Sequence, residues 1–354
     1  MTHVDLTECR KLQAEGILSI QSHPEFGLLI LNYTQRCQWE KHWTPLTLQC
    51  RGLITDLEGG IVARPFPKFF NLGEHTAEGS SLPSVNWNQG RYISEKMDGS
   101  LGIAYWTPFG HRIATRGSFE SSQAIRGSEL LMKLNHSGMR MFHTYLFEII
   151  LPENRIVVNY GNRECLVLLD IIDNHTGRGL QRNQLETEAH WLGCAIAEQL
   201  HAIPEESAKA DGREGVVVRF DDGMRIKIKF AEYCRLHKLL TGVNTKTIWE
   251  LLSSGKSVNE LLDSVPDEFF QWVNATATDL HTAHNIIAGR AKSTFDISCE
   301  ELGAAPRKDY AKRFALFPDL MPLLFLLLDG KSIRDAIWKR LKPERAECFR
   351  KDDE

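Results

Sequence analysis

Two β-type runs that meet at a tight turn are the strongest constraint that this sequence places on its fold. Both lie within residues 213–230, and Asp221-Asp222-Gly223 joins them. An Asp-Gly turn between two runs rich in β-branched residues predicts an antiparallel hairpin. Because successive side chains of a strand point to opposite faces, one face of the second strand carries only cations. These cations are Arg225, Lys227 and Lys229. The row is either a solvated outer face or one wall of a polar site.

The rest of the chain separates into a β-rich part and a helical part. Strands are expected over residues 27–33, 48–55, 91–96, 141–151 and 164–172, with a hairpin over 101–116 and helices over 6–12, 121–134 and 181–200. Beyond a polar loop at 205–212, helices are expected over residues 233–240, 246–252, 257–262, 266–287 or beyond, 307–316 and 321–341. The pattern predicts an α+β fold. An antiparallel-sheet domain with an N-terminal module would cover residues 1–243, and an all-helical accessory domain would cover 244–354.

Composition excludes several classes of protein. A chain of 354 residues with 42% hydrophobic and 25% charged residues is typical of a folded protein of about two domains. The formal net charge of −4 excludes a globally basic nucleic-acid binder but allows a local basic face. The eight cysteines are scattered without a zinc-type spacing, and the most apolar run, 315–328, is too short to span a bilayer. We expect a cytoplasmic protein with reduced thiols and no membrane partner.

The segment Glu95-Lys96-Met97-Asp98-Gly99-Ser100 indicates covalent chemistry on a lysine. A lysine amine is nucleophilic only when neutral, so such chemistry requires nearby cations, partial desolvation or a metal ion. Gly99 would permit a tight turn after the lysine, and Asp98 would hold that turn through its side-chain oxygens. Taken alone, the segment is more typical of an ordinary surface turn, so its interpretation depends on the surrounding residues.

Four further charged residues are candidates for a polar site. Prolines on both sides of Phe66 fix an extended arm that ends at Lys68, and Arg51 precedes a strand. Glu148 lies inside an apolar strand, where an unpaired carboxylate is costly, so it either points to solvent or faces a polar site. Glu214 opens the first strand of the hairpin. Singly, each of these residues also fits a solvated surface position or an ordinary ion pair.

Taken in order, these segments resemble the motifs of the covalent nucleotidyltransferases, the superfamily of ATP- and NAD-dependent polynucleotide ligases and messenger RNA capping enzymes. Arg51-Gly52 and the stretch 66–74 narrow the resemblance to the RNA ligase 1 family, whose type member is the phage enzyme that reseals broken tRNA. The resemblance covers roughly residues 25–240, and order, spacing and flanking residues agree at several separate places. It implies the antiparallel-sheet nucleotidyltransferase fold.

The resemblance also implies roles for the lysine segment and the acids. Lys96 would attack the α-phosphate of ATP and become adenylylated, with Glu95, Asp98 and Gly99 beside it in the nucleotide site. Glu148 would contact the ribose. The implied metal ligand is Glu214, and Val216 would pack near the base.

The implied phosphate-binding residues are cations. Lys227 and Lys229 would grip the α-phosphate, and Arg51 with Lys68 would engage the β- and γ-phosphates. Arg116 occupies the place of a basic residue that follows the lysine motif in the family. Positive charge at these places would stabilise phosphoryl transfer, and Mg²⁺ or Mn²⁺ would suit a site with few carboxylates. The sequence departs from the pattern of related enzymes in the strand at 166–172. Those enzymes often have an aromatic residue there that stacks on the base of the nucleotide, and this strand has none.

The implied function is an ATP-dependent RNA ligase. It would join a 5′-phosphate to a 3′-hydroxyl through lysyl-AMP and RNA-adenylate intermediates, in the repair of RNA such as tRNA. Other proteins would supply any end-healing kinase or phosphatase. A capping-type guanylyltransferase or a DNA ligase remains open, although those families usually continue with a β-rich domain and this chain continues with helices. A non-catalytic nucleotide- or RNA-binding module is the alternative of another class.

Overall fold

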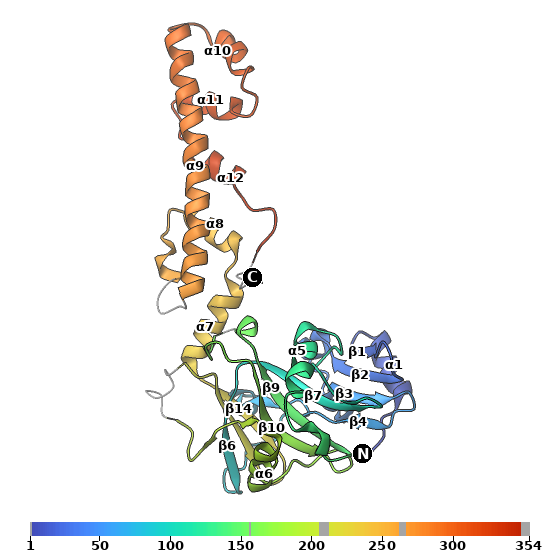
Figure 1. The fold of residues 1–354 in the computed structure, drawn as a ribbon. Coiled ribbons are helices and arrows are strands. Elements are labelled where there is room, and N and C mark those ends of the chain that lie inside the picture. The colour runs from blue at the N-terminus through green and yellow to red at the C-terminus, as the bar shows by residue number, and fades with distance from the viewer. Residues whose placement is uncertain (1, 156, 205–211, 262–266, 348–354) are drawn as a thin grey trace. The chain divides into compact units, whose positions relative to one another are not determined.

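The computed structural model describes residues 2–155, 157–204, 212–261 and 267–347. The chain divides into two compact units, Met1–Cys234 and Arg235–Glu354. The sheets lie in the first unit, and the described part of the second unit is helical (Figure 1). The division falls within helix α7 (Ala231–Gly242), N-terminal to the boundary expected after residue 243. The predicted α+β class, with antiparallel sheets followed by helices, is confirmed.

An antiparallel four-stranded sheet begins the first unit, with the order β1-β2-β3-β4. Its strands are β1 (Leu18–Ser22), β2 (Leu28–Tyr33), β3 (Arg51–Asp56) and β4 (Ile61–Ala63). Its helices are α1 (Leu6–Ala14), α2 (Gln35–Trp39) and α3 (Pro45–Gln49). The strand expected over 48–55 is wrong at its start because Thr44 and Thr47 form a capping box and Pro45 opens α3. The strand therefore begins at Arg51.

Two five-stranded sheets form the rest of the first unit, with the orders β11-β10-β9-β7-β8 and β12-β6-β13-β14-β5. The first contains β7 (Ser100–Thr107), β8 (Gly110–Ala114), β9 (His143–Ile150), β10 (Cys165–Asp173) and β11 (Ala195–Ile196). The second contains β5 (Phe70–Asn71), β6 (Arg91–Lys96), β12 (Gln199–Leu200), β13 (Gly215–Phe220) and β14 (Arg225–Lys229). Since β6 ends at Lys96 and β7 begins at Ser100, the chain crosses from one sheet to the other in the turn that follows the lysine.

Helices cover one face of the first five-stranded sheet. Leu130 of α5 (Ser122–Leu131) and Leu185 of α6 (Arg182–Leu192) are buried in the same cluster as Tyr145 and Phe147 of β9. The short elements α4 (Leu72–Thr76), η1 (His136–Gly138) and η2 (Pro152–Asn154) lie in the connections. These contacts fix β9, and with it Glu148, in a rigid layer.

The hairpin predicted over residues 213–230 is confirmed. β13 pairs with β14 in antiparallel register, and β13 also pairs with β6 on its other side. Ile226 is fully buried on one face of β14, as the alternation predicted. The cationic face is not a fully solvated one, since the Arg225 side chain is 8% exposed and the Lys229 side chain 29% exposed. The structure therefore favours the polar-site interpretation of this row.

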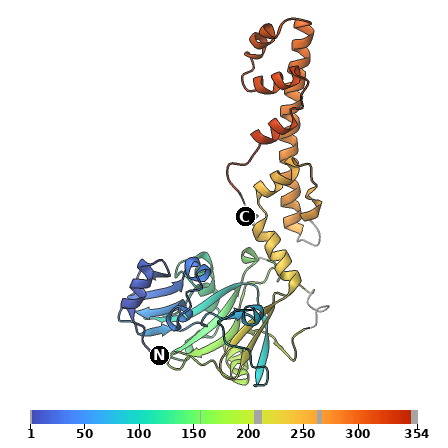
Figure 2. The same ribbon diagram turned by 180° about the vertical axis from the view of Figure 1, so that it is seen from behind.

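The second unit contains six helices among its described residues, counting the part of α7 beyond Cys234. These are α7, α8 (Thr245–Ser253), α9 (Asp267–Leu302), α10 (Arg307–Phe314), α11 (Met321–Leu328) and α12 (Arg334–Arg340), with the 3₁₀ turn η4 (Val258–Leu261). The orange and red helices α10 to α12 follow one another along the long helix α9 (Figures 1 and 2). Their core includes Ala291 of α9 packed against Phe314, Leu324 and Ile337. Within the described part of the chain, no helix has the length and apolar character that crossing a membrane requires.

Two expected helices are wrong in extent, and one expectation lies largely outside the described residues. The helix expected over 181–200 ends at Leu192 because Gly193 adopts φ 76° in the left-handed region, and the short strands β11 and β12 follow. The helix expected over 321–341 is two helices, since Gly330, with φ 67°, follows α11. The polar loop expected at 205–212 falls almost wholly in residues 205–211, which the structure does not describe.

Candidate active site

Three adjacent strands bring two lysines to one carboxylate. In the register of the second five-stranded sheet, Gly215 of β13 lies opposite Lys96 of β6 on one side and Lys229 of β14 on the other. Glu214 precedes Gly215 and is 3% exposed. Lys96 Nζ lies 2.7 Å from Glu214 Oε2, and Lys229 Nζ lies 2.8 Å from Oε1. One buried carboxylate thus holds both ammonium groups at the strand ends.

Gly215 is required by this arrangement. Its φ is 154°, and a Cβ at this position would lie 2.1 Å from the carbonyl oxygen of Ile228 and 2.9 Å from Lys229 Cα. No side chain fits there without separating β13 from β14. The glycine after Glu214, noted in the sequence only as part of a motif, thus allows the two strands to approach.

The turn after Lys96 is held by a buried aspartate. Asp98 is 4% exposed, and its Oδ2 accepts hydrogen bonds from the backbone N–H groups of Val157 and Val158, at 3.1 and 2.9 Å. The hydroxyl of Tyr233 donates to Asp98 Oδ1 at 2.8 Å, and the backbone N–H of Asp98 donates to the Tyr160 hydroxyl at 2.9 Å. The predicted role of Asp98 in shaping the turn has a geometric basis here. Sequence reasoning missed both tyrosines.

Glu148 faces the same site from the other sheet. Its Oε1 accepts a hydrogen bond of 3.0 Å from the backbone N–H of Gly99. A Cβ on Gly99 would lie 2.6 Å from the Ile149 carbonyl oxygen, so the glycine allows the turn to approach β9. Burial raises the pKa of Glu148 to about 7, with the positive charge of Lys96 opposing that effect and the negative charge of Glu214 adding to it. Of the two alternatives left open for Glu148, the structure shows the polar-site one.

A second group of cations surrounds Lys227 of β14, and its other members are Arg51 of β3 and Lys68, which precedes β5. Burial lowers the pKa of Lys227 to about 8, and the positive charges of Lys68, Lys96 and Arg51 act in the same direction. Burial also lowers the pKa of Arg51. The Nη1 atom of Arg51 is buried without a hydrogen-bond acceptor in the part of the chain that the structure describes. Clustered, desolvated cations with an unused donor form a site that an anion would stabilise.

Aromatic rings support these cations. Lys68 Nζ lies 5.6 Å from the ring centre of Tyr33, 5.3 Å from that of Trp43 and 5.2 Å from that of Phe70. The Arg116 guanidinium lies 5.5 Å from the Tyr33 ring centre. Cation–π contacts of this kind hold positive charge without neutralising it. Tyr33 and Trp43 precede the lysine motif by more than fifty residues, and no sequence signal assigned them to the site.

Phe69 extends this support to the cations on β14 and β3. The Arg51 and Lys227 charges lie 5.6 and 5.8 Å from the Phe69 ring centre. The end of the arm thus contributes Lys68 to the cation group, and the residue that follows it contributes a ring.

Two remaining candidates occupy the strands beside Lys96. Glu95 is partly buried, and its pKa is raised by burial and by the negative charge of Glu198. Val216 pairs with Glu95 in the sheet register and is fully buried with Ile93 and Val218. The nucleotide-binding roles of these two residues stay predictions.

The described residues include no group of three or more His, Cys, Asp or Glu side chains that could hold a metal ion. A magnesium ion that binds substrate phosphates keeps several waters and needs only one or two carboxylates. Glu214 and the neighbouring Glu148 fit that requirement. Glu214 would have to exchange its contacts with the two lysines.

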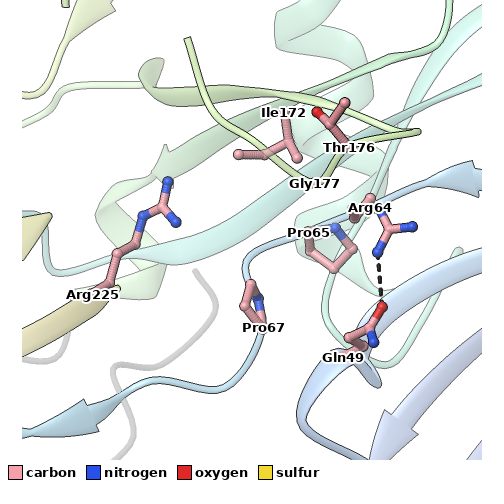
Figure 3. A pocket seen from close by; sticks show the side chains of 8 residues that line it. All are labelled: Gln49, Arg64, Pro65, Pro67, Ile172, Thr176, Gly177 and Arg225. Carbon is pink, nitrogen blue, oxygen red and sulfur yellow. Dashed lines mark hydrogen bonds between the residues drawn. The ribbon is translucent and has the colours of Figure 1, made fainter. Parts of the chain in front are cut away.

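A pocket of about 270 Å³ lies beside this cluster rather than within it. Its lining residues are Gln49, Arg64, Pro65, Pro67, Ile172, Thr176, Gly177 and Arg225 (Figure 3). None of them is among the residues that the sequence assigned to the site. Arg225, however, is the third cation of the β14 row, and Pro67 directly precedes Lys68.

The geometry and the comparisons with known proteins agree on the class. In the fold, a lysine at the end of a central strand is paired with a buried glutamate and faced by a second sheet. A structure from Aquifex aeolicus, provisionally named an ATP-dependent DNA ligase, has the same fold, with a TM-score of 0.50 and 13% sequence identity over 93% of this chain and 100% of that one.

The family follows from sequence. The model of the RNA ligase family matches residues 49–233, more than half of this chain, and the chain belongs to that family. A Thermovibrio ammonificans protein, provisionally named an RNA ligase, is 30% identical over 66% of this chain and 63% of its own length, so the match spans less than two thirds of that relative. An RNA ligase of Rhodothermus phage RM378 is 22% identical over 86% of this chain and 84% of its own length.

Proposed function

We propose that this chain is an ATP-dependent RNA ligase that seals a 5′-phosphate to a 3′-hydroxyl through lysyl-AMP and RNA-adenylate intermediates. The observation that carries the proposal is the meeting of Lys96 and Lys229 on Glu214, with Glu148 facing them. Lys227 lies on the same strand as Lys229 and near enough to Lys96 for the two charges to interact. Membership of the RNA ligase family supports RNA as the substrate.

In the first step, Lys96 gives up a proton to solvent, and its neutral Nζ bonds to the α-phosphorus of ATP while the bond from that phosphorus to the β-phosphate oxygen breaks and pyrophosphate leaves. In the free protein Glu214 holds the Nζ atoms of Lys96 and Lys229 at the strand ends. Once Glu214 takes the metal ion instead, Lys96 would act on the α-phosphate and Lys229 would contact the same phosphate. Lys227 adds positive charge beside it, and Arg51 with Lys68 receives the β- and γ-phosphates. Preorganised cations of this kind stabilise the charge on the transferring phosphoryl group and its leaving group.

The acids have separate roles in this proposal. Glu148 accepts a hydrogen bond from the ribose, while its existing bond to the Gly99 N–H keeps the carboxylate against the lysine turn. Glu214 would hold Mg²⁺ or Mn²⁺, which supplies further charge neutralisation at the phosphates. Arg116, which shares the Tyr33 ring with Lys68, adds a cation near the leaving phosphates.

The division of labour between the parts of the chain is a further element of the proposal. Residues 1–243 would carry the chemistry, and residues 244–354 would position the RNA. Several basic residues of the helical unit are already in ion pairs with Asp or Glu: Arg307, Lys312, Arg313 and Arg334. The contribution to RNA binding is therefore assigned to Lys292, Lys308 and Lys339, all exposed. Replacing these three by Gln should weaken RNA binding and reduce its salt dependence without changing self-adenylylation.

One experiment tests the reaction and its competitors together. The protein is incubated with a divalent metal and with labelled ATP or GTP, and the labelled protein is then offered nicked or single-stranded RNA and the matching DNA strands with 5′-phosphates. Label from ATP alone and sealing of RNA are expected. Label from GTP would favour a capping enzyme, preference for DNA would favour a DNA ligase, and absence of label would favour a binding module. RNA repair, with tRNA among the candidate substrates, is the proposed setting, and other proteins would heal the ends.

A further inference from the structure

The pocket of Figure 3 continues the row of cations that leads away from Lys96. Along β14 the cations follow one another from Lys229 to Lys227 to Arg225, and alternate residues of a strand are about 7 Å apart. Arg225 lines the pocket, so the pocket begins one strand repeat beyond Lys227. The arm runs in parallel, from Lys68 at the cation group back to Arg64 at the pocket. Strand β14 and the arm therefore both run from the cation group to the pocket.

The pocket has positive charge in excess on its β14 side. Asp170 is 1% exposed and forms ion pairs with both Arg225, at 2.6 Å, and Arg219, at 3.2 Å. One carboxylate thus faces two guanidinium groups, which leaves one positive charge without a matching negative charge in this trio. A phosphate entering beside Arg225 would gain from that charge in a partly desolvated position.

Flat apolar surfaces form the remainder of the pocket. The rings of Pro65 and Pro67 lie between Arg225 on one side and Arg64 with Gln49 on the other (Figure 3). The Arg64 guanidinium donates to Gln49 Oε1 at 2.8 Å and, through Nε, to the Asn174 carbonyl oxygen at 2.9 Å, which fixes its plane. A fixed guanidinium plane is a surface on which a nucleobase stacks, and the proline rings add apolar surface for van der Waals contact. The volume of about 270 Å³ lies just below the usual range for ligand pockets, which suits one nucleobase with the rest of its nucleotide outside.

The chemistry of the second step directs an RNA end to this place. Pyrophosphate leaves the α-phosphorus on the side opposite Lys96 Nζ, because attacking and leaving groups lie in line. In the next step the lysine is the leaving group, so the attacking 5′-phosphate must approach from the side that pyrophosphate vacated. Arg51 and Lys68 would then receive the 5′-phosphate. The nucleotide that carries it must lie next to them.

We propose that this pocket binds the first nucleotide of the 5′-phosphorylated RNA strand, an inference that rests on the proposed ligase function. The base packs on Pro65 and Pro67, and Arg225 meets the phosphate that joins the first nucleotide to the second. An oxygen of the 5′-phosphate bonds to the adenylate phosphorus while the bond from that phosphorus to Lys96 Nζ breaks. The lysine leaves as an amine that takes up a proton, and RNA-adenylate is formed.

Thr176→Trp tests the proposal by filling the pocket from its rim. Thr176 is exposed, and its backbone N–H, which donates to Asp173 Oδ1, is kept in the variant. The variant loses the hydrogen bond that the Thr176 hydroxyl accepts from the Arg178 N–H at 3.2 Å, in an exposed turn. Thr187→Trp, on an exposed position of α6 outside the pocket lining, is the matched control. Both variants are first converted to lysyl-AMP with ATP, and AMP transfer is then measured against concentration of a 5′-phosphorylated RNA.

The expected result is a rise of about tenfold in KM for the 5′-phosphorylated strand in Thr176→Trp, with little change in kcat and none in Thr187→Trp. An RNA whose first nucleotide lacks its base should show the same rise with the wild-type protein, and Thr176→Trp should add little to it. If Thr176→Trp loses lysyl-AMP formation, Arg225→Gln decides, since Arg219 still pairs with Asp170. Wild-type KM in Thr176→Trp and in Arg225→Gln would overturn the pocket assignment. A wild-type protein that forms no lysyl-AMP would instead refute the ligase function.

Discussion

Lys227→Met should stabilise the free protein while disabling nucleotide transfer. Lys227 is a partly buried ammonium group on β14, and the charges of Lys68, Lys96 and Arg51 all disfavour its protonated form. Methionine keeps a similar length and apolar stem but removes the charge. The clustered cations destabilise the folded protein until bound phosphates neutralise them. Removing one cation should therefore raise stability and lower the rate of nucleotide transfer.

The size of the effect follows from the pKa. Lowering the pKa of Lys227 from 10.5 to about 8 corresponds to a cost of about 3 kcal/mol at pH 7. Between pH 8 and 10.5 the unfolded chain holds this proton and the folded chain does not, so the stability of the wild type rises with pH there. The gain from Lys227→Met should therefore be largest at pH 7, fall to about 2 kcal/mol at pH 9, and vanish near the unfolded pKa.

Urea unfolding of both proteins at several pH values measures this gain. Lys229→Met is the matched control on the same strand face: Lys229 pairs with Glu214, so its loss should destabilise the protein by about 1 to 3 kcal/mol. Both variants should be slow in self-adenylylation. A Lys227→Met protein that is less stable than wild type at pH 7, or equally altered at pH 7 and 10, would refute the reasoning.

Three further predictions concern residues that shape the site. Gly215→Ala should destabilise the protein by about 2 kcal/mol or more in denaturant titration, because the new Cβ meets the Ile228 carbonyl oxygen; unchanged stability would contradict this. Tyr233→Phe should cost about 1 to 2 kcal/mol through the lost bond to Asp98 and slow adenylylation; a wild-type rate would count against a positioning role. Burial raises the pKa of Glu148 from 4.5 to about 7, so stability should fall as pH rises between these values, and Glu148→Gln should remove that slope in pH-dependent unfolding.

Local patterns in the sequence predict the parts of the fold that have strong periodicity or turn chemistry. The Asp222-Gly223 turn and the alternation of Arg225 to Lys229 predicted the hairpin, and the structure contains it as an antiparallel pair of strands. Gly193 and Gly330 are helix-ending residues that are visible in the sequence. The predicted helices ran past them because the apolar residues beyond each glycine continue the helical spacing. Two-residue strands such as β11 and β12 are too short to leave a periodic signature.

The residues of the site, like the elements of the fold, were predicted only where a local pattern marks them. Lys96, Glu214 and Lys229 were expected to act together, and the structure brings their side chains into contact. The bonds of Tyr160 and Tyr233 to Asp98 join segments far apart in the chain, and nothing in the local sequence of a tyrosine marks such a partner. The aromatic support of Lys68 and the pocket beside Arg225 likewise arise from packing between distant elements. Sequence patterns therefore indicated the charged groups, while the groups that position them required the structure.

Peptide mapping of the adenylylated protein tests the central claim most directly. The protein is incubated with ATP and a divalent metal, digested, and examined by mass spectrometry for AMP joined to lysine, with Lys96→Arg as the control that keeps the charge. The account predicts AMP on Lys96 alone and none on the variant, which should still join a pre-adenylylated RNA to a 3′-hydroxyl strand. AMP on Lys227 or Lys229, or full labelling of Lys96→Arg, would contradict it.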